Sequence, residues 1–431
     1  MPIDSPALVN KNILIISPQA WGNMFISKHH YAVELARRGN RVYFLNPPGE
    51  GGPAARPQTN FAARARNVEV IRSETVPDLW FIRHNLRFPY KLKFHALPLF
   101  HSLMRFQARR ILRAIGRPID IVWSFDLGYL YPFHFFGQSL KIFHPVDEPL
   151  TAAAIRAATG ADVLFAVTRE IVGKYHRFDI PRHFINHGVS NEFLAMAQAG
   201  DAGNEADATS DTPLPQTAGG GARSADVPGG VGASHAVRIG FSGNLLRPDI
   251  DRETFLKIIR DNPGVVFECW GSYKQGQSNI GGAADDATAA FAAALLEQPN
   301  IILHGPVPSD RLAKEIHRMD GFLICYDIHK DQSGGTNYHK IMEYLSTGKV
   351  IVSNNVTTYQ DRPDLLRMVA ERDNNRHLPS LFKEVITRLA EHNSPEARNR
   401  RIAFARENTY PKQLDRIAAI LEAMRPAAGS D

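Results

Sequence analysis

The sequence has few cysteines and no long apolar run. Its only cysteines are Cys269 and Cys325, and both fall in apolar, strand-like stretches. Such thiols are more often core residues than disulfide partners or metal ligands, so we expect no disulfide framework. No run of about 18 apolar residues predicts a transmembrane helix. The N-terminus, MPIDSPALVNKN, lacks the basic-then-apolar pattern of a secretory signal, so we expect a cytoplasmic protein.

One long stretch has no acidic residue. From Phe81 to Pro118 the chain carries nine Lys or Arg and no Asp or Glu. Because apolar residues are interleaved with these cations, the stretch predicts one or two basic amphipathic helices. They could rest on an anionic membrane surface, or they could be core helices with a solvated basic face. The net charge of the whole chain, +6, is too mild to imply a nucleic-acid partner.

Length and composition indicate two domains. At 431 residues the chain exceeds one ordinary core and suits two domains of about 200 residues each. Residues 197–236 consist almost wholly of Ala, Gly, Asp, Ser, Thr and Pro, so they bury too little apolar surface to offset their ordering entropy. We interpret them as a flexible linker or insertion between an N-terminal domain at 1–196 and a second domain at 237–410. A C-terminal helix and tail are predicted at 411–431.

Strands and helices alternate on both sides of the linker. Lys11 to Leu45 has the pattern of a βαβ unit, with a strand, a helix that ends at Gly39 and a second strand. The same alternation resumes at Val237 and continues to a strand at 350–352. The predicted fold class is therefore α/β, with two Rossmann-like, doubly wound domains facing a cleft. Loops at the carboxyl ends of the strands should hold the ligands.

The loop and helix before the last of these strands are a candidate nucleotide site. Residues 337–353 read NYHKIMEYLSTGKVIVS, a polar helix start followed by a glycine stop and a buried strand. Gly334 and Gly335 would let the backbone approach a ligand, and the helix start favours a phosphate. Lys340 would add a charge for a diphosphate, and Glu343 would accept hydrogen bonds from ribose hydroxyls. Alternatively, these two side chains form only a surface pair.

A second loop follows the first strand of the same domain. In IGFSGNLLRPDID, Gly243 and Asn244 come directly after the predicted strand, and Arg247 lies a short reach beyond. The loop matches neither G-x-G-x-x-G nor G-x-x-x-x-G-K-[ST], which disfavours hydride transfer and ATP hydrolysis of the common kinds. Asp249 and Asp251 have the spacing of an Asp-x-Asp metal pair, but they lie in this loop and we expect no metal site.

Four segments together resemble the GT-B family of nucleotide-sugar glycosyltransferases. NYHKIMEYLSTGKVIV is similar to the family's donor-site motif, N-x-x-K-x-x-E-Y-L-x-x-G-K-x-V-V/I. SPQAWGNMFISKHHYAVELARRGNRVYFLNPP resembles the N-terminal βαβ unit, FINHGVSNEF the interdomain stretch N-G-V-D-x-x-F, and IGFSGNLLRPDID the opening of the donor domain. They occur in the family's order and span most of the chain outside 197–236. The closest resemblance is to bacterial cell-surface polysaccharide transferases, such as those of teichuronic acid or exopolysaccharide assembly.

The resemblance implies substrates and a set of binding residues. It implies a nucleoside-diphosphate sugar donor, a saccharide or polyprenyl-diphosphate-linked acceptor, and catalysis without a cofactor or an essential metal. The implied donor-binding residues are Gly243, Asn244, Arg247, Gly335, Thr336, Asn337, Lys340 and Glu343. Trp21 and Gly22 are assigned to the acceptor-side loop. The chain departs from the family where Gly335 replaces a glutamate of many retaining members, and where His187 and Ser190 replace Asn and Asp.

The predicted catalytic base is Asp147, in the segment IFHPVDEP. It follows the predicted strand at 141–143, so it should lie at the cleft edge of the first domain and could take the acceptor's proton. The alternative role of Asp147 is to cap the helix that follows. The other catalytic candidates are His144, Glu148 and His187. Two other functions stay open on this fold: a catalytically silent, nucleotide-sensing or scaffolding partner, and a nucleotide-sugar epimerase.

Overall fold

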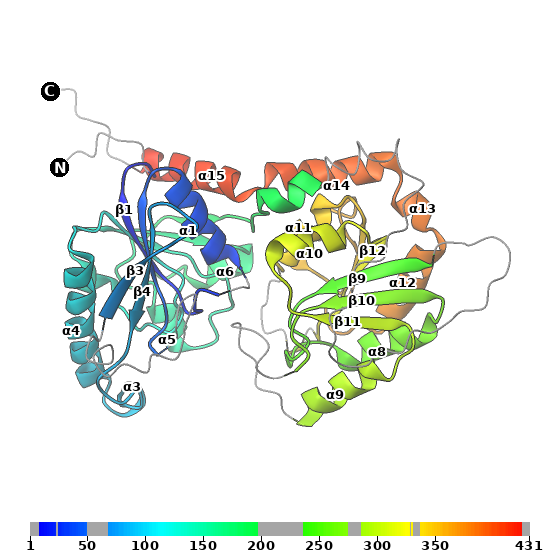
Figure 1. Ribbon diagram of the computed structural model, residues 1–431, viewed down its shortest axis with the longest axis horizontal. Helices are drawn as coiled ribbons and strands as arrows, with labels where there is room; N and C mark the ends of the chain where they lie inside the picture. Colours follow the sequence, from blue (N-terminus) through cyan, green and yellow to red (C-terminus); the bar gives the residue numbers. More distant parts are fainter. Residues whose placement is uncertain are drawn as a thin grey trace.

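Two α/β domains, each built around its own sheet, lie side by side along the molecule. The computed structural model describes residues 8–22, 25–49, 68–196, 236–274, 286–327, 329–330 and 337–424. Figure 1 shows the two sheets and, along one edge of the molecule, a helical segment near the C-terminus that runs past both of them. The predicted fold class, α/β with two doubly wound domains and a C-terminal helix, is confirmed.

The first sheet has eight strands, all parallel to their neighbours except for one antiparallel pair at an edge. Their bounds are β1 (Asn12–Ile16), β2 (Arg41–Leu45), β3 (Val68–Arg72), β4 (Leu79–His84), β5 (Ile121–Ser124), β6 (Leu140–Phe143), β7 (Val163–Ala166) and β8 (Arg182–Phe184). Their order is β3-β4-β2-β1-β5-β6-β7-β8. Along β1, Ile13 and Ile15 join one core and Leu14 and Ile16 the other, because successive side chains point to opposite faces.

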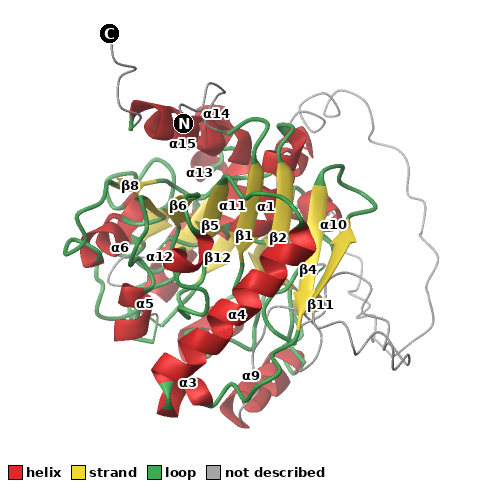
Figure 2. Ribbon diagram, turned by 90° about the vertical axis from the view of Figure 1, so that its left-hand side faces the viewer, coloured by secondary structure: helices red, strands yellow, loops and turns green. Residues whose placement is uncertain are grey.

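Helices cover both faces of this sheet. Their bounds are α1 (Ser27–Arg37), α3 (Leu92–His95), α4 (Leu97–Ile115), α5 (Ala152–Arg156) and α6 (Arg169–Lys174). Tyr31 and Leu35 of α1 are buried on one face, while Phe100, Met104 and Ile111 of α4 are buried on the other. Figure 2 shows α4 running diagonally across the outside of the domain. The predicted basic helices at 81–118 are therefore α3 and α4, although the start of that stretch belongs to β4.

The second sheet has six strands, all parallel. In sheet order they are β11 (Ile301–Gly305), β10 (Val265–Trp270), β9 (Val237–Ser242), β12 (Gly321–Ile324), β13 (Val350–Ser353) and β14 (Arg367–Met368). The helices of this domain are α8 (Arg252–Asp261), α9 (Asp286–Leu296), α10 (Ser309–Ile316), α11 (Lys340–Ser346), α12 (Leu378–Thr387), α13 (Leu389–His392) and α14 (Pro395–Glu407). Strands buried on both faces by helices give the continuous apolar runs seen in the sequence.

The chain crosses between the domains twice, and the two crossings pair. After α14 the chain returns as α15 (Tyr410–Ala423), whose Leu414 and Ile417 join the core of the first domain. The backbone N–H of Val189 donates to the Asn408 carbonyl at 2.9 Å, and that of Tyr410 donates to the Val189 carbonyl at 3.2 Å. A Cβ on Gly188 would lie 2.6 Å from the Tyr410 ring, so only glycine lets the crossings approach this closely.

Candidate functional site

Lys340, the first residue of α11, is buried under the ends of the central strands of the second sheet. Its side chain is 4% exposed, and its Nζ donates to the Tyr326 hydroxyl at 2.6 Å. The same ammonium lies 4.5 Å from the centre of the Phe241 ring and 5.0 Å from that of Tyr326. The interpretation of Lys340 as half of a surface ion pair is therefore wrong, because burial removes it from the surface.

Burial shifts the pKa of Lys340 and that of Glu343 toward neutral pH. Burial, reinforced by the charge of Arg247, lowers the pKa of Lys340 to about 7. Burial also raises the pKa of Glu343, and the charge of Lys340 opposes that shift. A bound anion would favour the charged form of Lys340, so this ammonium is suited to hold a phosphate group.

Glycine lets the loop after β9 come close to this ammonium. A Cβ on Gly243 would collide with Lys340 Nζ, and one on Gly271 would collide with the Gly243 carbonyl. The backbone N–H of Gly243 donates to the Trp270 carbonyl at 2.7 Å, and Asn244 turns the loop by accepting from the Leu246 N–H at 2.9 Å. Gly243 thus has a steric reason to be glycine, as the sequence predicts for a backbone that approaches a ligand.

Arg247 is half exposed and lies beside the ring of Tyr326. Its guanidinium forms a bidentate pair with Asp249, with Nε 2.8 Å from Oδ1, and lies 5.9 Å from the centre of the Tyr326 ring. Tyr326 therefore contacts both predicted diphosphate-binding cations. No sequence pattern marks Tyr326 as a site residue, because its only signal is its position two residues after β12.

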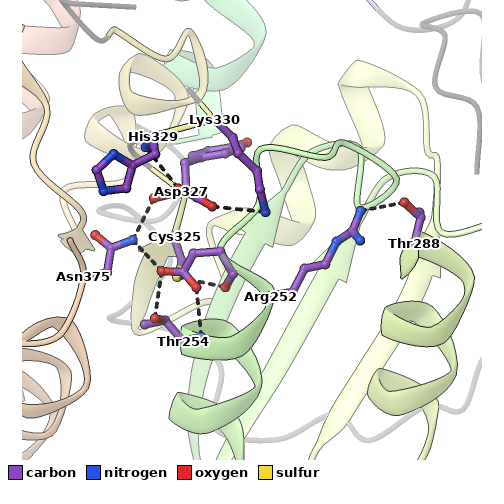
Figure 3. Close-up of polar contacts among 10 residues, drawn as sticks. Arg252, Thr254, Thr288, Cys325, Asp327, His329, Lys330 and Asn375 are labelled. Carbon is purple, nitrogen blue, oxygen red and sulfur yellow. Dashed lines mark hydrogen bonds and ion pairs between the residues drawn. The ribbon is translucent and has the colours of Figure 1, made fainter. Parts of the chain in front are cut away.

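The Asp249 and Asp251 pair has structural roles. Asp249 is paired with Arg247, and Asp251 caps α8 by accepting from the Thr254 N–H at 3.1 Å and its hydroxyl at 2.8 Å. Asn375 donates to the same Asp251 carboxylate at 2.9 Å. Figure 3 shows the side chains of Asn375 and Thr254 pointing toward the same group. No group of three or more His, Cys, Asp or Glu in the part of the chain that the structure describes could hold a metal ion.

Asn337 and His187 join the two domains at the edge of the site. The Asn337 side chain donates to the Val167 carbonyl at 2.8 Å, and the Asn337 backbone carbonyl lies 3.1 Å from His187 Nε2. Since a carbonyl only accepts, Nε2 carries the ring proton and Nδ1 accepts from the Ser27 hydroxyl at 3.0 Å. Burial lowers the pKa of His187 to about 4. His187 is thus a neutral bridge between domains. Gly335 and Thr336 lie outside the described residues.

Asp147 is exposed after β6, beside a cluster of cations from both domains. The cap of α5 is Thr151, whose hydroxyl accepts from the Ala154 N–H at 3.1 Å, so the interpretation of Asp147 as a helix cap is wrong. Burial lowers the pKa of His187, and the Asp147 carboxylate opposes that shift. Burial also lowers the pKa of Arg247, but the bond to Asp249, with help from Asp147, raises it overall. Its role as a base remains a prediction.

Lys28, a buried lysine near Asp147, was not predicted from the sequence. Lys28, in the first turn of α1, has no exposed surface and donates to the Gln19 side chain. Burial lowers its pKa to about 8, while the carboxylates of Asp147 and Asp126 oppose this. Because the chain places Lys28 beside two histidines in a polar helix start, its pattern gives no signal of burial.

The remaining predicted site residues belong to the first domain, and most of them are buried or paired there. The Trp21 indole is 7% exposed and contacts Phe25, His29 and Phe44 edge to face, so it fills the core. Gly22, in a bend, is the last described residue before a gap at 23–24. His144 is fully buried and accepts from the Trp123 indole at 3.3 Å, and Glu148 pairs with Lys174. Cys269 and Cys325 are buried free thiols, as predicted.

Solved structures share this architecture over nearly the whole chain. No family model matches the sequence, and no curated protein matches it either. Sucrose-phosphate synthase from Thermosynechococcus elongatus is 12% identical, with a TM-score of 0.62 over 96% of this chain and 100% of its own. HepE from Anabaena, in complex with UDP and glucose, is 11% identical, with a TM-score of 0.60 over the same shares. The chain has the GT-B fold.

A third similar structure agrees with this assignment. The α,α-trehalose 6-phosphate synthase from Burkholderia multivorans is 12% identical, with a TM-score of 0.61 over 98% of this chain and 100% of its own. In a GT-B fold the carboxyl edges of the two sheets face one another. The contacts of Asn337 with Val167 and His187 join the two domains directly, and the Asp147 carboxylate of the first domain lies close enough to the Arg247 guanidinium of the second to raise its pKa.

Proposed function

We propose that this protein is a glycosyltransferase that moves a sugar from a nucleoside-diphosphate sugar to a saccharide acceptor. The observation that carries the proposal is the buried Lys340 ammonium, which lies against the Gly243 backbone at the start of α11. Burial disfavours the charged form of this lysine, and a bound diphosphate would favour it. Glu343, one helical turn along, would accept hydrogen bonds from ribose hydroxyls.

The donor is proposed to be a UDP-sugar, with UDP-glucose the first to test. HepE was solved with UDP and glucose, and an E. coli protein of the same fold with UDP-2-fluoro glucose. In the transfer, the acceptor oxygen forms a bond to the sugar's anomeric carbon while the bond from that carbon to the diphosphate breaks. Asp147 takes the acceptor's proton, and Lys340 with Arg247 stabilises the departing nucleoside diphosphate. Neither role requires a cofactor or an essential metal.

A thermal-shift panel tests the donor site. UDP, GDP, CMP, ADP and dTDP, each with and without common sugars, are mixed with the wild type and with Glu343→Ala. A nucleotide at about 100 times its dissociation constant stabilises the folded protein by about 2.7 kcal/mol, which raises the melting temperature measurably. We expect one nucleotide to give a shift that Glu343→Ala loses. No shift with any nucleotide would refute the donor site and favour a silent scaffolding protein, and an epimerised donor would favour an epimerase.

We also propose that α3 and α4 hold the enzyme against an anionic membrane, where surface polysaccharides are assembled on lipid carriers. Five large apolar side chains there are exposed: Tyr90, Phe94, Leu97, Leu99 and Phe106. We call these residues, together with the exposed cations Lys91, Arg105, Arg109 and Arg113, the α3–α4 face. Leu99, Phe106 and Arg113 recur every seven residues and so share one exposed stripe. No described helix is both long and apolar enough to cross a membrane.

Vesicle binding tests this face. Each Arg near an anionic surface contributes about 1 kcal/mol, so Arg109→Gln with Arg113→Gln should weaken binding to phosphatidylserine vesicles about 30-fold at low salt. Phe94→Ser with Phe106→Ser should weaken it further, because both side chains are more than half exposed. The control is Arg311→Gln with Arg318→Gln, two exposed arginines of the second domain. If the two double arginine variants bind the vesicles equally well in co-sedimentation, the α3–α4 face does not bind membranes.

A further inference from the structure

A cavity of about 550 Å³ opens at the carboxyl edge of the first sheet. It lies where β1, β2, β4 and β5 end, because its lining residues come from the loops that follow these strands. Its volume is within the range of small-molecule sites, about 300 to 1,000 Å³. The lining residues that matter here are Asn46, Asn85, Phe88, Tyr90, Asp126 and Tyr131.

The cavity lining combines aromatic rings with short polar side chains. Phe88, Tyr90 and Tyr131 supply flat apolar surface, while Asn85 and Asp126 supply hydrogen-bonding groups. Asp126 is fixed in place, since its carboxylate accepts from the Gly128 N–H at 2.7 Å and the Leu130 N–H at 3.0 Å. A sugar ring presents C–H groups on its faces and hydroxyls around its rim, which is the pattern that such a lining complements.

The sheet order places this cavity between the α3–α4 face and the proposed transfer site. Asp126 follows β5, and the neighbouring strand, β6, leads to Asp147. Asp126 and Asp147 both oppose the fall in the pKa of Lys28 that burial causes, so the two carboxylates lie near the same buried lysine.

At its other end the cavity meets the α3–α4 face. Tyr90 lines the cavity and is also 43% exposed among the apolar residues of that face. Its ring contacts Phe94 edge to face, with centres 6.0 Å apart. Lys93 Nζ donates to the carbonyl of Gly128, another lining residue, at 2.6 Å, which puts a cation at the cavity's rim. An amphiphile could therefore keep its apolar chain outside while its polar end enters.

We propose that this cavity binds the saccharide of a lipid-linked acceptor, whose apolar carrier lies along the α3–α4 face. This rests on the proposed function and specifies its acceptor. The sugar stacks on Tyr90 and bonds to Asn85 and Asp126, with its reactive hydroxyl directed along the sheet edge toward Asp147. The charged linkage to the carrier stays at the rim beside Lys93. Acceptors without an apolar chain lose the contacts with Phe94 and Leu97 and bind more weakly.

Two photoreactive octyl glucosides test both the site and the orientation. One carries a diazirine on the sugar and the other at the end of the octyl chain, and each is used below its micelle-forming concentration. We expect the sugar-borne probe to label residues 85–90 and 126–131, and the chain-borne probe to label residues 94–106. Labels in the same segment for both probes, or the two patterns exchanged, would overturn the proposal, as would no labelling.

Matched variants localise the labelling. Asn85→Trp fills the cavity from an exposed position, and Tyr90→Ala removes the stacking ring. Because the Tyr90 ring also contacts the buried Phe100, with centres 5.9 Å apart, the melting temperature of each variant is compared with that of the wild type. Each should reduce labelling by the sugar-borne probe at least fivefold, whereas Asn399→Trp, at an exposed site on α14 in the second domain, should not. Undiminished labelling in both cavity variants would refute the site. Because labelling needs no donor, its failure is distinct from failure of the glycosyltransferase proposal, which the nucleotide panel detects.

Discussion

Replacing Lys340 by methionine should weaken UDP binding about 10- to 100-fold without destabilising the protein. A hydrogen bond to a charged group contributes about 1.5 to 3 kcal/mol, and Lys340 is the buried cation nearest the Gly243 loop. Methionine keeps the apolar contacts with Phe241 and Tyr326 and removes a charge that burial disfavours, so the melting temperature should not fall. Calorimetric titration of UDP into both proteins measures the effect.

The same lysine predicts how binding depends on pH. In the free protein the pKa of Lys340 is about 7, and a bound diphosphate would raise it. Above pH 7, Lys340 therefore gains a proton when UDP binds. UDP affinity should therefore fall as pH rises from 7 to 9, by up to about tenfold per pH unit. Glu343 and Asp249 favour the charged lysine and Arg247 disfavours it; all three remain in Lys340→Met.

Lys340→Met separates the pH dependence that Lys340 causes from any that Glu343, Asp249 or Arg247 causes. In Lys340→Met the fall in affinity between pH 7 and 9 should be much smaller. Lys349→Met, which removes a partly exposed lysine three residues beyond the end of α11, is the matched control. A similar loss of affinity in both variants, or an unchanged pH dependence in Lys340→Met, would mean that Lys340 does not contact the diphosphate.

The architecture could be predicted from local patterns because α/β folds repeat them. A buried apolar run, a helix ending in glycine and a second run predict a βαβ unit, and β1, α1 and β2 form one at nearly the expected bounds. β3 was missed because Glu69 and Arg72 interrupt its apolar pattern. It is an antiparallel edge strand whose residues are only partly buried, so it needs no continuous apolar run.

The candidate site was predictable where the backbone limits the choice of residue. Gly243 and the start of α11 follow strands, and strand order brings such loops to one edge of a sheet. Tyr326 and Lys28 were missed for a different reason. Their roles depend on which side chains surround them in the folded chain, and burial of a lysine or stacking of a cation on a tyrosine leaves no periodic signal.

The outcome for His187 shows the same limit. As a histidine in an interdomain motif it was a reasonable catalytic candidate, since an exposed imidazole titrates near neutral pH. In the structure both ring nitrogens are bonded, one to Ser27 and one to the Asn337 carbonyl, and burial keeps the ring neutral. Sequence identifies the residue that connects the domains, but only the fold shows that its nitrogens are already occupied. Asp147 is left as the exposed group at this edge.

Replacing Asp147 by asparagine should lower kcat about 100- to 10,000-fold, the usual contribution of a general base. The amide has the same shape but cannot take the acceptor's proton. Because Asp147 is exposed and does not cap α5, the free energy of unfolding should change by less than about 0.5 kcal/mol. Initial rates of UDP release, with UDP-glucose and a lipid-linked acceptor, measure the loss.

The neighbouring carboxylate supplies the control for this experiment. Glu148 lies one residue along the chain and is paired with Lys174, so Glu148→Gln should leave kcat within about threefold. Asp147→Asn should also leave UDP binding intact, because the proposed diphosphate contacts come from Lys340 and Arg247 in the other domain. A kcat within threefold of wild type in Asp147→Asn would show that another group accepts the proton. The oxygens of the departing diphosphate, held beside Lys340, would then be the nearest base.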